Sequence, residues 1–158
     1  MNDQTEKKDM IRMFFILWSI TVMTAIFIFS AQKGETSGAL SGGLLRLLLG
    51  WLGIDGPAEL IDLLHLLLRK FAHFSIYALL GVGVMGTALT FTGRGWKKFL
   101  LVLVICAGYA VTDEFHQLFV GERCGSPLDV LLDSCGAACG CGVTMVVWYI
   151  CSRINRKR

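Results

Sequence analysis

Charged side chains are scarce in this chain. Asp, Glu, Lys and Arg make up only 17% of its 158 residues, against about 25% in an ordinary soluble domain. The mean hydropathy is +0.62, and 54% of the residues are hydrophobic. The charges fall in short clusters between long uncharged runs, which a soluble core would not need. These features exclude an ordinary soluble domain and predict a membrane protein.

The sequence also lacks the patterns that identify several other classes. It contains no internal repeat and no low-complexity tract. Its six cysteines form no CxxC pair with partner histidines, which argues against a structural zinc site. An HExxH motif is absent as well. We expect no nucleic-acid partner.

Four runs with few or no charges are each long enough to cross about 30 Å of hydrocarbon as a helix. They predict an all-α, polytopic fold in a single domain, residues 1–158. The first run follows a basic segment, as in a signal peptide, but Phe29-Ser30-Ala31 fits a cleavage site poorly, so we expect a retained helix. The predicted spans are about 13–31, 71–91, 99–120 and 134–152.

The segment of about 38–70, between the first two spans, is too apolar to be a plain loop. Its leucines around Arg46 predict a short helix at 41–54 that lies in the membrane interface or folds back partway. Pro57 followed by Glu59 predicts a second helix start. From there a leucine-rich helix would continue into the second span.

The positions of Lys and Arg predict the orientation. The N-terminal segment has three of them, the loop at 93–98 has three and the C-terminus has four, against five in the two other loops together. Cytoplasmic segments hold the excess of positive charge. We therefore expect a multi-pass protein of the cell membrane with both termini in the cytoplasm.

Polar residues recur at helical spacing near the outer ends of the predicted spans. Spacings of three and four residues place such side chains on one face of a helix. The set comprises Ser30 and Gln32 after the first span, Lys70, His73 and Tyr77 in the second, Asp113, Glu114, His116 and Gln117 in the third, and Arg123, Asp129 and Asp133 before the fourth.

This set predicts a polar cavity beneath the outer leaflet. The third run is too short to span unless its helix includes Asp113 to Gln117, and ionisable groups inside a membrane usually face a cavity and pair with one another. A histidine beside carboxylates suits proton transfer near neutral pH. Arg123 and Lys70 would bind an anion, so the set contains the groups needed to hold a lipid phosphate.

Two further patterns leave alternatives open. His73, His116, Asp113 and Glu114 could ligate a divalent ion, but no HExxH-type spacing is present, so a divalent metal is possible but not favoured and no cofactor is expected. In the fourth span, Gly136 and Gly140 form a small-xxx-small face that favours packing within the chain over dimerisation.

These motifs resemble those of the VanZ-like family, and the resemblance runs through nearly the whole chain. One departure is Asp133, where the family commonly has asparagine. The matching positions are Phe29-Ser30-Ala31-Gln32 with Ser37, Arg69-Lys70-Phe71-Ala72-His73-Phe74 with Tyr77 and Gly81, and Asp113-Glu114-Phe115-His116-Gln117 with Phe119, Gly121, Arg123, Asp129, Gly136 and Gly140.

The resemblance implies a cell-envelope protein. The family is named after a protein associated with low-level resistance to the glycopeptide teicoplanin, although resistance is not implied for every member. It also looks like part of a broader group of small helical membrane proteins proposed to process lipid or lipid-linked headgroups. The residues that it assigns to a proposed active site are His73, Asp113, Glu114, His116, Arg123 and Asp129.

Three functions are consistent with this sequence. The first is an enzyme of phosphoryl-transfer or hydrolytic type, with a membrane lipid or lipid-linked cell-wall precursor as its substrate and His73 or His116 as nucleophile or general base. Lys70, Gln117, Tyr77, Ser30 and Gln32 would bind that substrate. The second is a non-catalytic protein that binds or shields a lipid or glycopeptide. A proton-coupled transporter ranks last, because the inner halves of the spans offer almost no polar residues.

Overall fold

The computed structural model describes residues 3–32, 34–53, 57–121 and 125–155. Every regular element in these ranges is an α-helix. Four helices are long and apolar enough to cross a membrane, which confirms the predicted all-α, four-span fold. In chain order the helices are α1 (Asp3–Ser30), α2 (Gly34–Leu52), α3 (Ala58–Leu89), α4 (Gly95–Gln117) and α5 (Pro127–Asn155).

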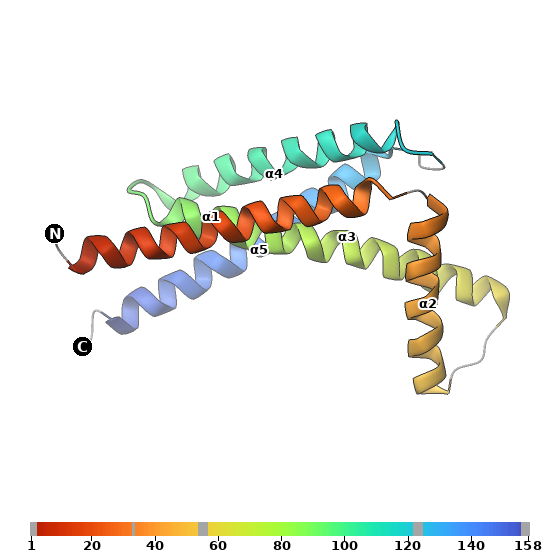
Figure 1. Cartoon of the computed structure of the whole chain (residues 1–158). Helices are drawn as coiled ribbons and strands as arrows, with labels where there is room; N and C mark the ends of the chain where they lie inside the picture. The colour runs from red at the N-terminus through yellow and green to blue at the C-terminus, as the bar shows by residue number, and fades with distance from the viewer. Residues whose placement is uncertain (1–2, 33, 54–56, 122–124, 156–158) are drawn as a thin grey trace.

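The four spanning helices run side by side, and α2 lies across α3 near one end of the bundle (Figure 1). The start of α1 and the end of α5 lie at the same end of the bundle. We call the opposite end, where α2 crosses α3, the distal end. Because a four-span chain returns to the side on which it began, both termini lie on one side of the membrane.

Helix α2 is the apolar helical segment expected between the first two spans. Leu45 is buried, and the side chain of Ser41 lies 2.5 Å from Nε2 of His65 on α3. The other side of α2 exposes Leu47 and Trp51, the latter by 89%. An apolar face of this kind, on a helix that lies across the bundle, suits contact with the membrane interface.

Helix α3 begins at Ala58, directly after Pro57, which confirms the predicted helix start. The helix bounds differ from the predicted ones at two places. Helix α2 begins at Gly34, well before the expected start at residue 41. Helix α4 was expected to continue to residue 120 but ends at Gln117. The reason is that the next three backbone amides bond carbonyls three residues back, which tightens the chain into a turn.

The closest contact in the bundle lies between α3 and α5. A Cβ atom added at Gly136 or Gly140 would clash with the backbone carbonyl of Phe74 or Ala78, and one added at Gly81 would clash with Ala137. The two backbones therefore touch because glycine occupies these positions. This confirms the predicted role of the small-xxx-small face in packing within the chain.

Helices α1 and α4 pack around this central pair. The indole nitrogen of Trp18 on α1 donates a hydrogen bond of 2.9 Å to the Leu79 carbonyl on α3. Tyr109 on α4 donates one of 2.8 Å to the Met23 carbonyl on α1. Without these two hydrogen bonds, the indole N–H and the phenol O–H would lie unpaired between apolar surfaces. The two bonds fix the depth of α1 against its neighbours.

The outer surface of the bundle is apolar. Phe14 on α1, Val104 on α4 and Val146 on α5 are each more than half exposed. An apolar surface of this extent is unfavourable in water but matches lipid tails. The exposed side chains are thus explained by the membrane rather than by poor packing.

The α3–α5 contact predicts different effects for two equivalent substitutions on α5. Gly140→Ala would place a methyl group against the Ala78 carbonyl, whereas Gly142 has no atom of another element within 4 Å of an added Cβ. We expect Gly140→Ala to lower stability by about 1–3 kcal/mol and Gly142→Ala to leave it unchanged or raised. Thermal unfolding of both purified variants measures the difference, and equal transitions would contradict the backbone contact.

Candidate functional site

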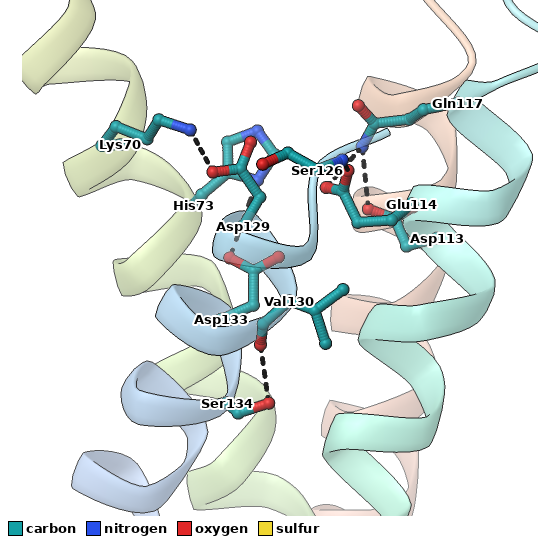
Figure 2. Close-up of polar contacts among 10 residues, drawn as sticks. All are labelled: Lys70, His73, Asp113, Glu114, Gln117, Ser126, Asp129, Val130, Asp133 and Ser134. Carbon is teal, nitrogen blue, oxygen red and sulfur yellow. Dashed lines mark hydrogen bonds and ion pairs between the residues drawn. The ribbon is translucent and has the colours of Figure 1, made fainter. Parts of the chain in front are cut away.

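The candidate site lies at the distal end, where three spanning helices bring ionisable groups together (Figure 2). Lys70 and His73 come from α3, Asp113, Glu114 and Gln117 from α4, and Asp129 and Asp133 from α5. From His73 to its end at Leu89, α3 rises about 24 Å, somewhat less than the roughly 30 Å of hydrocarbon. The site therefore lies near the boundary between hydrocarbon and headgroups.

Two contacts between a basic and an acidic side chain connect α3 to α5 at successive helical turns. Lys70 pairs with Asp129, and His73 Nδ1 lies 3.7 Å from Asp133 Oδ1. The spacings of three residues on α3 and four on α5 place both pairs on the facing sides of the two helices. The outer pair is partly exposed, whereas Asp133 is completely buried.

Glu114 joins α4 to the start of α5. Its Oε2 accepts a hydrogen bond of 2.8 Å from the backbone amide of Ser126, and its Oε1 accepts one of 3.3 Å from the side-chain amide of Gln117. The same amide donates to Asp113 Oδ2 at 3.2 Å. The Gln117 side chain thus holds two neighbouring carboxylates in fixed positions, and all three residues are buried.

A cavity of about 390 Å³ opens beside these groups, between α1, α2 and α3. Its walls are mostly apolar, with Ile26, Leu44 and Leu68 from three different helices. Its polar lining is formed by Ser30, Gln32, Ser41, Arg69, His73, Tyr77 and Asp113.

Several polar atoms in this region have no hydrogen-bond partner among the described residues. Three of them belong to residues that line the cavity: Ser30 Oγ, His73 Nδ1 and Tyr77 Oη. Both carboxylate oxygens of Asp133 also lack a hydrogen-bond partner among the described residues. Because native proteins rarely leave buried polar groups unpaired, these atoms mark a place where water, a bound molecule or an ion is expected.

A model of the VanZ/LLP1 family matches residues 15–149, which is most of the chain and includes every residue of the candidate site. The chain belongs to the VanZ/LLP1 family. The family expected from the sequence motifs is thereby confirmed. No curated protein and no solved structure matches the chain.

In this VanZ/LLP1 protein most of the predicted site residues lie together at the distal end. Tyr77, Ser30 and Gln32 line the cavity with His73 and Asp113, while Lys70 and Asp129 form the outer ion pair. The predicted residue Arg123 lies outside the described residues. The assignment of catalytic and substrate-binding roles to these residues stays a prediction.

His116 has a different environment from the other predicted residues. Its ring stacks on Phe27 of α1, with a centroid distance of 5.0 Å, and its Nε2 is buried without a hydrogen-bond partner among the described residues. On a helix Gln117 is turned only about 40° from Asp113, whereas His116 is turned about 60° the other way, toward α1. Because its side chain faces Phe27, His116 is not part of the cavity lining.

The structure adds two residues that were absent from the predicted polar set. Arg69 lines the cavity, and Ser126 contributes its backbone amide. Asp133, which belonged to that set without an assigned role, faces His73. Asp133 had a visible sequence pattern, since it lies four residues after Asp129. The amide of Ser126 had none, because a backbone donor is independent of residue type. Arg69 is adjacent to Lys70 in the sequence, but unlike Lys70 it lines the cavity.

The possible metal ligands also differ from those considered at the outset. Among the described residues, His73, Glu114 and Asp133 offer ligand atoms that all lie within 4.8 Å of one another. Asp133 thus replaces both Asp113 and His116 in the set suggested by residue type. Sequence spacing could not identify this set, because each member comes from a different helix.

Proposed function

We propose that this VanZ/LLP1 protein is a cell-envelope enzyme that acts on the phosphate-bearing headgroup of a phospholipid or a lipid-linked cell-wall precursor. The observation that carries the proposal is the cavity at the distal end. It joins apolar walls to a polar lining in which Ser30 and Tyr77 have hydroxyl groups without partners among the described residues. An amphipathic molecule at the membrane surface needs both kinds of surface.

The apolar part of the cavity suits a lipid tail. Ile26 and Phe29 of α1 face Leu68 and Ile76 of α3, and Leu44 of α2 contributes a third wall. The region lies near the headgroup boundary, so a lipid entering from the bilayer would keep its tail among apolar side chains. Binding sites for small molecules usually combine such walls with a few placed polar groups.

The polar part suits a phosphate. Arg69 lines the cavity, and Lys70 lies one residue further along α3 beside Asp129. A guanidinium binds phosphate oxygens through two parallel hydrogen bonds, and hydroxyl donors can complete the contact. Ser30 of α1 and Tyr77 of α3 also line the cavity and are potential donors.

The reacting centre of the proposed enzyme is formed by His73 with Asp133 and Glu114. Of the two predicted histidines, His73 is favoured because it lines the cavity, whereas His116 stacks on Phe27. An imidazole held beside carboxylates is suited to acid/base work at neutral pH. Asp113 also lines the cavity and would contact the substrate directly.

A non-catalytic role remains the second candidate function. The predominance of apolar lining in the cavity favours binding of a lipid or of the lipophilic part of a glycopeptide such as teicoplanin. Shielding of a surface precursor would need affinity but no proton transfer. His73→Gln separates the two functions, because glutamine retains hydrogen bonding but not the acid/base chemistry of imidazole.

The proposed location of the site is the outer leaflet, with both termini in the cytoplasm. The excess of Lys and Arg near the termini and in the 93–98 loop supports it. We expect alkaline phosphatase fused after Gly121 to be active and the same enzyme fused after Asn155 to be inactive in a bacterial host. The reverse pattern would place the site on the cytoplasmic side.

The proposed activity predicts a change in membrane lipids. Membranes from cells that lack the protein are compared by mass spectrometry with membranes containing equal amounts of wild type, His73→Gln, Asp113→Asn or Asp62→Asn. Asp62 is exposed on α3 away from the cavity lining and provides a matched carboxyl-to-amide control. We expect one phospholipid or polyprenyl-linked species to change with wild type and Asp62→Asn only.

Other patterns in that experiment would decide against the enzyme. A lipid change that persists in both His73→Gln and Asp113→Asn would remove these residues from the chemistry. Identical profiles in all membranes, with polyprenyl-linked species covered, would favour the non-catalytic binder.

A further inference from the structure

The centre of the distal cluster contains one imidazole and two carboxylates from three helices. His73 comes from α3, Glu114 from α4 and Asp133 from α5, and their ligand atoms all lie within 4.8 Å of one another. Figure 2 shows the three side chains converging on the space between the helices. The packing of the bundle, rather than a local sequence motif, creates this group.

The burial of Asp133 gives an independent reason to expect a ligand there. Its side chain is 0% exposed, and neither carboxylate oxygen has a hydrogen-bond partner among the described residues. A buried carboxylate without compensation is strongly unfavourable. His73 Nδ1, at 3.7 Å, is itself without a hydrogen-bond partner in the described part of the chain. The unpaired atoms of both residues thus face each other.

No lysine or arginine among the described residues compensates Asp133. Lys70 is paired with Asp129, one helical turn away. Arg69 lines the cavity, and no hydrogen bond or ion pair between it and Asp133 is found among the described residues. Asp113 and Glu114, both buried, add further negative charge close by. The centre therefore has an excess of carboxylate over nearby positive charge.

We propose that His73, Glu114 and Asp133 bind one divalent first-row transition-metal ion. An imidazole nitrogen with carboxylate oxygens is a donor set suited to Zn²⁺ or Mn²⁺. Three protein ligands leave at least one coordination position for water or substrate. The inference concerns metal binding and goes beyond the proposed lipid chemistry.

The geometry needs only small adjustments to accept the ion. Ligand atoms bound at about 2.0–2.2 Å are separated by at most about 4.4 Å, so the 4.8 Å spread closes with side-chain shifts of under about 1 Å. Glu114 is already oriented by the Ser126 amide and the Gln117 side chain. Hydrogen bonds of this kind to ligating carboxylates are typical of metal sites.

The position of the ion would connect it to the cavity. His73 lines the cavity and binds the ion in this arrangement, so the open coordination position lies beside the polar cavity wall. A divalent cation there would offset the carboxylate charge and attract a phosphate oxygen. With the ion bound, His73 would serve as a ligand, and the acid/base role proposed for it would fall to a water on the ion.

Metal binding is tested directly on the purified full-length chain in detergent. The protein is stripped with EDTA and dialysed, and Mn²⁺ is titrated while electron paramagnetic resonance measures the free ion. We expect one Mn²⁺ per chain for wild type and at least a tenfold weaker affinity for His73→Gln and Asp133→Asn. Competition with Zn²⁺ in the same titration ranks the two metals.

Two further variants separate this site from other carboxylates. Asp62→Asn removes an exposed acid on α3 and should retain wild-type affinity. Asp113→Asn removes a buried acid of the cluster that is outside the proposed ligand set, so it should weaken binding much less than the ligand variants do. Wild type that binds no ion overturns the proposal whatever the variants do. Unchanged affinity in Asp133→Asn overturns it as well, because the ion would then lie elsewhere.

A thermal shift guards against variants that fail to fold. Mn²⁺ should raise the unfolding temperature of wild type and Asp62→Asn but not that of folded Asp133→Asn, since a ligand stabilises only the state that binds it. The metal titration and the lipid analysis can also fail independently. Asp113→Asn is expected to lose the lipid change but still to bind the metal, so the metal site and the proposed lipid chemistry are tested separately.

Discussion

The close contact between the backbones of α3 and α5 determines the rest of the structure. Gly81, Gly136 and Gly140 permit this contact, since a Cβ at any of them would clash with a facing carbonyl. Asp129 and Asp133 lie on the same stripe of α5 as the two glycines, at spacings of four, three and four residues. The contact therefore continues outward as the Lys70–Asp129 ion pair and the facing pair of His73 and Asp133.

This arrangement explains why charge is tolerated at a depth where it is costly. Tight packing removes water from around Asp133 and leaves it facing His73, while Asp129, one turn further out, reaches Lys70 and partial solvent exposure. Glu114 is held by the start of α5 through the Ser126 amide. The helices thus bring carboxylates together that would repel one another, which is a cost that natural sequences carry mainly at functional sites.

Much of the fold could be predicted from the sequence because its determinants are local. The long uncharged runs define the four spans, and Lys70, His73 and Tyr77 share a helix face through their spacing alone. The glycines of α5 likewise lie where a close helix contact was expected. Family membership followed from motifs that extend across these same elements.

The remaining features depend on which helices meet and in what register. The group of His73, Glu114 and Asp133 is formed by three helices, so no single segment encodes it. The stacking of His116 on Phe27 depends on the position of α1, which spacing along α4 does not determine. The end of α4 at Gln117 also escaped prediction, because the following turn has the apolar sequence Leu118-Phe119-Val120.

The central claim is that the distal cavity holds a lipid, and native mass spectrometry of the purified chain tests it most directly. Ile76→Trp would fill the cavity, whereas Leu79→Trp, on the same helix, alters an exposed apolar position that does not line it. The account predicts one retained phosphate-bearing lipid per chain for wild type and Leu79→Trp, and its loss in folded Ile76→Trp. Equal lipid retention by all three proteins would contradict it.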